Sequence, residues 1–251
     1  MKERIRINGD AISLRHALGE DAGSPVDVFA LLSTLKDLTV VFEPMSDCIS
    51  GMTAKYDDIN LIAINSNLSK GRQRFTAAHE LCHLHFHDHF KTMICSKDLL
   101  GKKDDYEREA DQFASFFLAP YEALFRFIQI DLDKAGKRLS IEDVIRIEQY
   151  FGMSHQAALV RLQTDKFITE SEALLLKKDV IKTARSLGFS TELYKPTPKD
   201  YQFMTTGSYV RLAEELRTKE LVSSGKYEEL LLDAFRADIV YGDSLPEDEY
   251  D

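Results

Sequence analysis

Cysteine is scarce in this 251-residue sequence, and long apolar runs are absent. A disulfide framework is not expected, because the sequence has only three cysteines, an odd number: Cys48, Cys82 and Cys95. No apolar stretch approaches the ~20 residues that span a membrane. The N-terminal segment MKERIRINGD also lacks the apolar part of a signal peptide. We therefore expect a cytoplasmic protein that has no membrane partner and keeps its cysteines reduced.

Positive charge is also scarce, because 42 acidic residues face only 32 basic residues and give a formal net charge of −10. An acidic chain repels the phosphate backbone, which disfavours nucleic-acid binding by the whole protein. A local basic patch that senses a nucleic acid as an activating signal stays open. Hydrophobic residues make up 44% of the chain, which is enough to bury a sizeable core.

The hydrophobic pattern predicts an α+β fold. A helix over residues 24–36 precedes a β-branched segment at residues 38–42 that is typical of a strand. Residues 51–56 and 59–64 are also predicted to be strands. We expect these strands to form a small antiparallel sheet that packs on a helical core.

Two helices supply that core. Residues 70–87 carry apolar side chains on nearly all sides, which is typical of a buried helix. A second helix begins near Asp105 and ends before Pro120, because proline cannot continue a helix. Beyond Pro120 the chain is predicted to be all-helical.

Capping residues mark two further helices between residues 140 and 166. Ser140 and Asp143 form a capping-box pattern. Gly152 fits a helix end, and Ser154 can cap the next helix. The arrangement resembles a helix-turn-helix, but its second helix offers few polar side chains for base contacts. We therefore favour a scaffold or substrate-docking role over DNA binding.

The last part of the chain, residues 171–251, is predicted to be a helical C-terminal extension. A linker with two prolines interrupts it, and its tail is acidic. The predicted helices are 171–187, 209–222 and 227–237, the linker is 189–208, and the tail is 243–251.

The histidines are concentrated in one helix. Five of the seven lie between positions 79 and 89, and residues 79–83 form the motif H-E-x-x-H. Residues four apart share a helix face, so His79 and His83 can bind one metal ion. Glu80 is turned ~100° from His79 and can hold a metal-bound water as a general base. Polar residues are costly on an apolar helix unless a metal compensates them.

A zinc site of this kind needs a third protein ligand, and the next helix offers candidates. Glu107 and Asp111 lie one turn apart on one edge of its apolar stripe, whereas Glu109 falls on the other edge. A glutamate and an aspartate at this spacing are typical of glutamate-type zinc peptidases. We therefore predict that Glu107 is the third ligand and that Asp111 supports His79 by a hydrogen bond.

These segments resemble the ImmA/IrrE family of zinc metallopeptidases. The resemblance rests on RFTAAHELCHLHFH followed by EREADQFASFFLAP, on INLIAINSN before the motif, and on the proline-started N-terminal helix. It is strong over about residues 25–120 and looser to about residue 170. The sequence departs from the family at Cys82, where small residues are usual, and in its longer C-terminal part.

The resemblance implies a gluzincin-like zinc metallopeptidase domain over residues 1–170. It would hold the zincin-type catalytic core at about 25–120 and the helix-turn-helix-like helices at about 140–166. The family's activity implies site-specific cleavage of a regulatory protein, a DNA-binding helix-turn-helix repressor. Cleavage would derepress a stress, mobile-element or anti-phage defence operon. By resemblance, one Zn²⁺ per chain is bound by the two motif histidines and Glu107, and Glu80 is the catalytic base.

Two other interpretations remain. The histidine-rich segment could scavenge metal, or zinc could stabilise a non-catalytic regulator that binds a repressor without cleaving it. Dependence of cleavage on Glu80 separates the enzyme from the regulator.

Cys95 lies in the segment between the motif helix and the Glu107 helix. Because this segment joins the two helices that carry the predicted ligands, it must pass near the active-site cleft. Because thiolates bind zinc well, Cys95 could take the fourth position and hold the enzyme latent. A buried, inert thiol is the alternative.

We expect a substrate strand to add to the sheet edge formed by residues 51–64. The residue that stabilises the oxyanion stays open among four candidates: Tyr56, Tyr121, His87 and His155.

Overall fold

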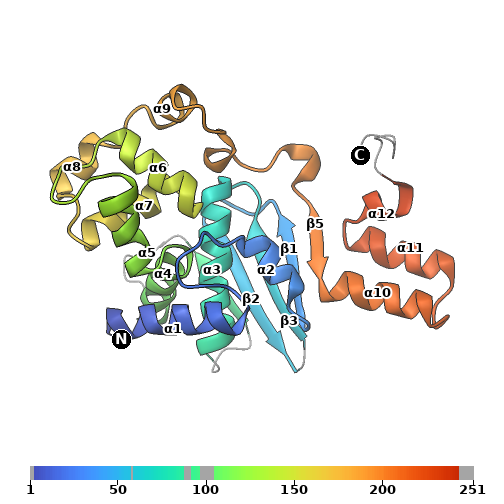
Figure 1. Cartoon of the computed structure of the whole chain (residues 1–251). Coiled ribbons are helices and arrows are strands. Elements are labelled where there is room, and N and C mark those ends of the chain that lie inside the picture. The colour runs from blue at the N-terminus through green and yellow to red at the C-terminus, as the bar shows by residue number, and fades with distance from the viewer. Residues whose placement is uncertain (1–2, 58, 88–91, 97–104, 243–251) are drawn as a thin grey trace.

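A computed structural model describes residues 3–57, 59–87, 92–96 and 105–242 and has an α+β fold (Figure 1). The helices in this part of the chain are α1 (Arg4–Ala17), α2 (Val28–Thr34), α3 (Lys70–Phe86), α4 (Asp105–Leu118), α5 (Tyr121–Arg126), α6 (Ile141–Phe151), α7 (His155–Thr164), α8 (Glu170–Leu175), α9 (Val180–Ser186), α10 (Ser208–Thr218), α11 (Ser224–Asp233) and α12 (Ala237–Tyr241). The strands are β1 (Leu38–Glu43), β2 (Ile49–Tyr56), β3 (Ile59–Asn65), β4 (Thr92–Ser96) and β5 (Met204–Gly207).

The sheet is mixed, with the strand order β4-β2-β3-β1-β5. Strands β2 and β3 pair antiparallel, and β3 then lies beside β1 and pairs parallel with it. The prediction of a purely antiparallel sheet is wrong at this point, because the second strand of the β2–β3 pair inserts next to β1. The α+β class itself is confirmed.

Strand β4 occupies one edge of the sheet. It pairs antiparallel with β2, and Gly51 of β2 faces Cys95 of β4 in the register. The prediction that residues 51–64 offer a free edge to a substrate strand is therefore wrong. The outer edge of β2 is covered by β4, and β3 lies inside the sheet.

Helix α3 is the centre of the core, as predicted from its apolar surface. It packs on β2 and β3 with one side and on α4 with the other, and α1 packs on α4 in turn (Figure 1). Residues Ala77, Ala78 and Leu81 are fully buried, and Cys82 belongs to the same apolar cluster. Such a helix holds its polar side chains in fixed positions.

Helix α1 lies outside the predicted elements, and one buried arginine attaches it to the core. The Arg15 guanidinium donates hydrogen bonds to the carbonyl oxygens of Phe117 and Asp21 at 2.7 Å each, and also to that of Ser24. It is fully buried, so its side chain fixes α1 against α4 and the loop before α2.

The predicted caps of α6 and α7 are confirmed. Ser140 and Asp143 form a reciprocal capping box, Gly152 ends α6 in the left-handed conformation, and the Ser154 hydroxyl accepts from the Ala157 N–H. Helix α7 packs against α3, which brings the helix-turn-helix-like pair next to the histidine motif.

The C-terminal part differs from its prediction in two places. The helix predicted over residues 171–187 is two helices, α8 and α9, because Asp179 adopts a positive φ of 58° before α9 begins. The predicted linker contains β5, which pairs with β1. Helices α10–α12 follow at the opposite side of the sheet from α6–α9 (Figure 1). The predicted acidic tail lies outside the described residues, as does His89.

None of the helices in the described ranges has the length and apolarity required to cross a membrane.

Candidate metal centre

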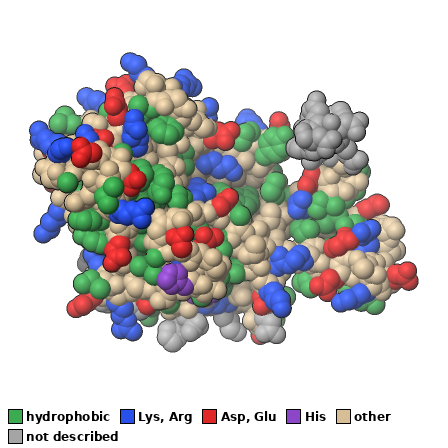
Figure 2. Space-filling view, in the orientation of Figure 1, with side chains coloured by type: hydrophobic (Ala, Val, Ile, Leu, Met, Phe, Trp, Pro, Cys, Tyr) green, Lys and Arg blue, Asp and Glu red, His purple; other side chains and the backbone are tan. Residues whose placement is uncertain are grey.

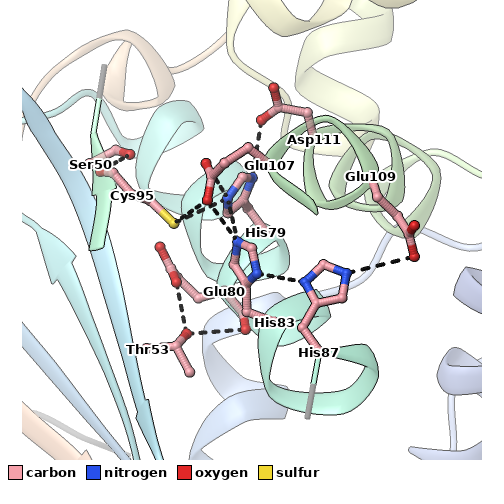
Figure 3. Close-up of polar contacts among 10 residues, drawn as sticks. All are labelled: Ser50, Thr53, His79, Glu80, His83, His87, Cys95, Glu107, Glu109 and Asp111. Carbon is pink, nitrogen blue, oxygen red and sulfur yellow. Dashed lines mark hydrogen bonds and ion pairs between the residues drawn. The ribbon is translucent and has the colours of Figure 1, made fainter. Parts of the chain in front are cut away.

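Helix α3 directs both motif histidines to one point. His79 and His83 are one turn apart and nearly fully buried, and their Nε2 atoms lie 3.0 Å from each other (Figure 3). Both rings stand on the helix face that looks toward α4. The spacing of the motif therefore places two nitrogen donors at one position, as a shared metal ion requires.

Glu107 and Cys95 complete a group of four donors. From the first turn of α4, the Glu107 carboxylate reaches His79 Nε2 at 3.5 Å and His83 Nε2 at 3.3 Å. From β4, the Cys95 sulfur lies 3.2 Å from His79 Nε2 and 3.6 Å from Glu107 Oε1. One ligand atom from each residue lies within 4.8 Å of all the others.

This donor set fits a tetrahedral zinc ion. Zinc bonds of about 2.0–2.3 Å place neighbouring donor atoms about 3.3–3.6 Å apart in a tetrahedral site. Five distances between potential donor atoms, with both Glu107 oxygens counted, fall between 3.0 and 3.6 Å. Two imidazoles, a carboxylate and a thiol are also ligand types that zinc accepts.

Asp111 holds His79 from the side opposite the donors. Its Oδ1 lies 3.0 Å from His79 Nδ1, so that the Nε2 atom points into the cluster. Burial alone would lower the pKa of His79, but the hydrogen bonds to Asp111 and Glu107 outweigh burial and raise it to about 10. Burial would raise the pKa of Glu107, whereas hydrogen bonds from His79 and His83 hold it well below its usual range.

A second histidine contact orients His83. Its Nδ1 lies 2.7 Å from His87 Nδ1, and His87 Nε2 lies 3.7 Å from a carboxylate oxygen of Glu109 (Figure 3). Glu109 thus faces His87, while Glu107 faces the donors. The two glutamates of α4 differ in role because they lie on different sides of the helix.

Glu80 lies beside the cluster and is fully buried. The Thr53 hydroxyl of β2 is 2.7 Å from Glu80 Oε2 and 3.2 Å from the Glu80 carbonyl oxygen. The other carboxylate oxygen, Oε1, has no hydrogen-bond partner among the described residues. Burial raises the pKa of Glu80, so the side chain is suited to receive a proton.

Gly51 gives Glu80 the space that it occupies. A Cβ atom at position 51 would lie 2.5 Å from the Thr76 methyl group, 2.8 Å from Glu80 Oε1 and 2.9 Å from the Ala63 carbonyl oxygen. Sequence analysis did not single out Gly51 or Thr53. A glycine inside a strand is a signal of close approach, but nothing in the sequence names its neighbour.

A cleft of about 630 Å³ opens from the donor cluster toward the helix-turn-helix-like pair. Its walls come from α1, α3, α4 and α7 and from the edge of the sheet, and they include His79, Cys95, Phe75 and Val160. The four oxyanion candidates do not line this cleft as the structure describes it. His155, for example, pairs with Glu148 and the Leu176 carbonyl.

Comparison with known proteins agrees with this geometry. A family model of M78 peptidases, described as an IrrE N-terminal-like domain, matches residues 36–163, which is about half of the chain. The chain belongs to the M78 peptidase family. The predicted membership of the ImmA/IrrE group is thereby confirmed, and the M78 match indicates a function of the metallopeptidase type. No curated protein matches the chain.

The M78 match contains all four donors, Glu80 and Asp111. It ends at residue 163, within α7, so it includes most of the cleft wall. The boundary at residue 170 between a peptidase domain and a C-terminal extension stays a prediction.

Proposed function

We propose that this M78 protein is a zinc-dependent endopeptidase that cleaves a regulatory protein at one site. The observation that carries the proposal is the convergence of His79, His83 and Glu107 beside a buried carboxylate with one unpartnered oxygen. A general base next to a metal-ligand cluster is the arrangement that peptide hydrolysis needs.

Each residue of the site has a separate role in the proposed hydrolysis. Bound zinc would polarise the peptide carbonyl and make water a stronger acid. Glu80 accepts a proton from the attacking water at Oε1, while Thr53 holds its other oxygen. Glu80 then returns the proton to the leaving amine. Asp111 keeps the Nε2 atom of His79 directed at the metal.

The proposed substrate is a helix-turn-helix repressor, and its cleavage would derepress a stress, mobile-element or anti-phage defence operon. Resemblance to the ImmA/IrrE group supports this, together with a cleft of about 630 Å³ beside the donor cluster. Helix α7 lines the cleft, which favours a substrate-docking role for the helix-turn-helix-like pair over DNA binding. A cytoplasmic location belongs to the same proposal.

Co-expression with a candidate helix-turn-helix repressor from the same genome tests the proposal. New N-termini of that partner are mapped by mass spectrometry, with Glu80→Gln as the control. A single cut that disappears with Glu80→Gln supports a specific peptidase. A stable complex without a cut, in wild type and control alike, would instead favour the zinc-stabilised, non-catalytic regulator.

Cys95 extends the proposal to regulation. We infer that its thiolate is the fourth zinc ligand of a latent form, because its sulfur lies 3.2 Å from His79 Nε2 and 3.6 Å from Glu107 Oε1, close to the spacing of ligands around a tetrahedral zinc ion. Strand β4 carries it there, and β4 is held to the sheet by β2 alone. Movement of this edge strand would withdraw the thiolate and open the fourth position to water.

Replacement of zinc by cobalt tests whether Cys95 is a metal ligand without any activity assay. A Co²⁺–thiolate bond gives an absorption band in the near ultraviolet that a site of nitrogen and oxygen ligands lacks. We expect the band in the wild type and in Cys48→Ser, whose cysteine is exposed, and its loss in Cys95→Ala. A wild-type cobalt protein without the band, or Cys95→Ala with unchanged basal cleavage, would contradict the latch.

A further inference from the structure

At the α7 end of the cleft, one arginine has no side-chain partner among the described residues. Three arginines line the cleft, and two of them, Arg4 and Arg161, share the carboxylate of Asp165 at 2.6 and 2.5 Å. The guanidinium of the third, Arg72, makes no hydrogen bond or ion pair with any described residue. It is nevertheless partly buried, and burial lowers its pKa. An unpaired cation in such a place favours an anion from outside the chain.

The position of Arg72 in its helix points the same way. It belongs to the first turn of α3, where the helix dipole disfavours a cation and favours an anion. This turn contains no acidic residue, and the side chain of Ser69 does not cap it. A negatively charged ligand beside Arg72 would therefore offset the unfavourable position of this cation in the first turn of α3.

The acidic groups that line the cleft do not neutralise Arg72. Both of them, Glu107 and Asp111, contact the histidines at the other end of the cleft. In a chain with a net charge of −10, the α7 end of the cleft thus keeps an uncompensated positive charge. Such local charge selects a ligand of the opposite sign.

The distance from Arg72 to the metal donors sets where the anion lies. Arg72, Phe75, Thr76 and His79 all line the cleft from the same face of α3. Arg72 and His79 are seven positions apart, which is about 10 Å along the helix axis. An extended peptide covers that length in about three residues.

We propose that Arg72 recognises an acidic side chain of the substrate, about three residues from the bond that is cut. This inference rests on the proposed endopeptidase function and names the substrate class: a peptide segment with aspartate or glutamate at that distance. Because an endopeptidase cuts inside a chain, the carboxylate comes from a side chain. The carboxylate of a substrate C-terminus is the competing source.

Cleavage profiling tests the sequence preference. The full chain, with Cys95→Ala in parallel, is incubated with a proteome-derived peptide library, and cuts absent with Glu80→Gln are collected. We expect aspartate and glutamate to be enriched about three residues from the cut. The enrichment should vanish with Arg72→Gln and turn toward lysine and arginine with Arg72→Glu. The control is Arg185→Gln, an exposed arginine of α9 outside the cleft.

A binding measurement decides the same question without catalysis. Zinc-loaded Glu80→Gln protein is titrated by NMR with three short alanine-based peptides that differ in one group. The first is blocked at both ends and carries one glutamate, the second has glutamine in its place, and the third has glutamine and a free C-terminus. We expect the glutamate peptide to bind roughly tenfold tighter than the glutamine peptide, and Arg72→Gln to remove the difference.

The outcomes separate the two proposals. Equal or absent binding of the two blocked peptides, or a preference unchanged by Arg72→Glu, would overturn the role of Arg72. Preference for the free C-terminus alone would overturn the side-chain assignment in favour of a terminal carboxylate. No Glu80-dependent cut in the library would contradict the endopeptidase function, while the NMR comparison would still decide on Arg72.

Discussion

Gly51 is the point where β2 comes closest to the motif helix, and Gly51→Ala should damage both stability and catalysis. The new methyl carbon would lie 2.5 Å from the Thr76 methyl group and 2.9 Å from the Ala63 carbonyl oxygen, against about 3.4 Å or more for ordinary contacts. Ala63 belongs to the backbone of the paired strand β3, so it cannot move without disturbing the ladder. Overpacking of this kind costs about 2 kcal/mol of unfolding free energy.

The same methyl carbon would lie 2.8 Å from Glu80 Oε1, the oxygen that is proposed to take the proton. Relief of this contact displaces the carboxylate, and a displacement of about 1 Å costs roughly 100-fold in rate. Zinc content should stay near one per chain, because no proposed ligand lies on β2.

Urea unfolding and peptide cleavage measure the two effects of Gly51→Ala. Gly9→Ala is the matched control, because Gly9 lies inside α1 with no atom within 4 Å of the added carbon. The control should gain about 1 kcal/mol from helix propensity and keep full activity. A Gly51→Ala protein as stable and as active as the wild type would refute the close packing at Glu80.

Three further predictions concern the surroundings of the metal donors. Thr53→Val should keep zinc but lower cleavage by roughly 10–100-fold, because Glu80 loses a buried hydrogen bond, while Thr53→Ser should stay close to wild type. Asp111→Asn should weaken zinc affinity by roughly 10–100-fold in a competition titration with a chelator, and excess zinc should restore cleavage. Removal of zinc by a chelator should lower the melting temperature, and added zinc should restore it. Unchanged cleavage by Thr53→Val would contradict the role of Thr53, and unchanged zinc affinity of Asp111→Asn would contradict the role of Asp111. An unchanged melting temperature after chelation would contradict a bound zinc ion.

The parts of the fold that sequence predicted are those with local signals. The apolar surface of residues 70–87 predicted the buried helix α3, and Ser140, Gly152 and Ser154 marked helix ends through their own backbone preferences. Helix propensity, capping and strand periodicity act within a few residues, so one sequence is sufficient to recognise them.

The parts that sequence missed depend on distant partners. The parallel pairing of β1 with β3 follows from where the β2–β3 pair inserts, which no local pattern specifies. Helix α1 has only a weak apolar stripe, and its position depends on the buried guanidinium of Arg15. The break before α9 lies at Asp179, where no glycine marks the positive φ.

The candidate site shows the same division. Helical spacing placed His79 and His83 on one face, and the pattern typical of glutamate-type zinc peptidases selected Glu107 and Asp111. The supporting groups Thr53 and Gly51 come from the sheet. Arg72 is recognisable as unpaired among the described residues only once the partners of the other charges in the cleft are known. Their roles depend on tertiary contacts.

The most direct test of the central claim measures metal content and peptide cleavage in the same preparations of wild type, Cys95→Ala and the two corresponding Glu80→Gln proteins. We predict one zinc per chain in all four and a cut at one position that requires Glu80, with more cleavage in Cys95→Ala than in wild type. Cleavage at the same position by Glu80→Gln protein with full zinc would contradict the proposed mechanism.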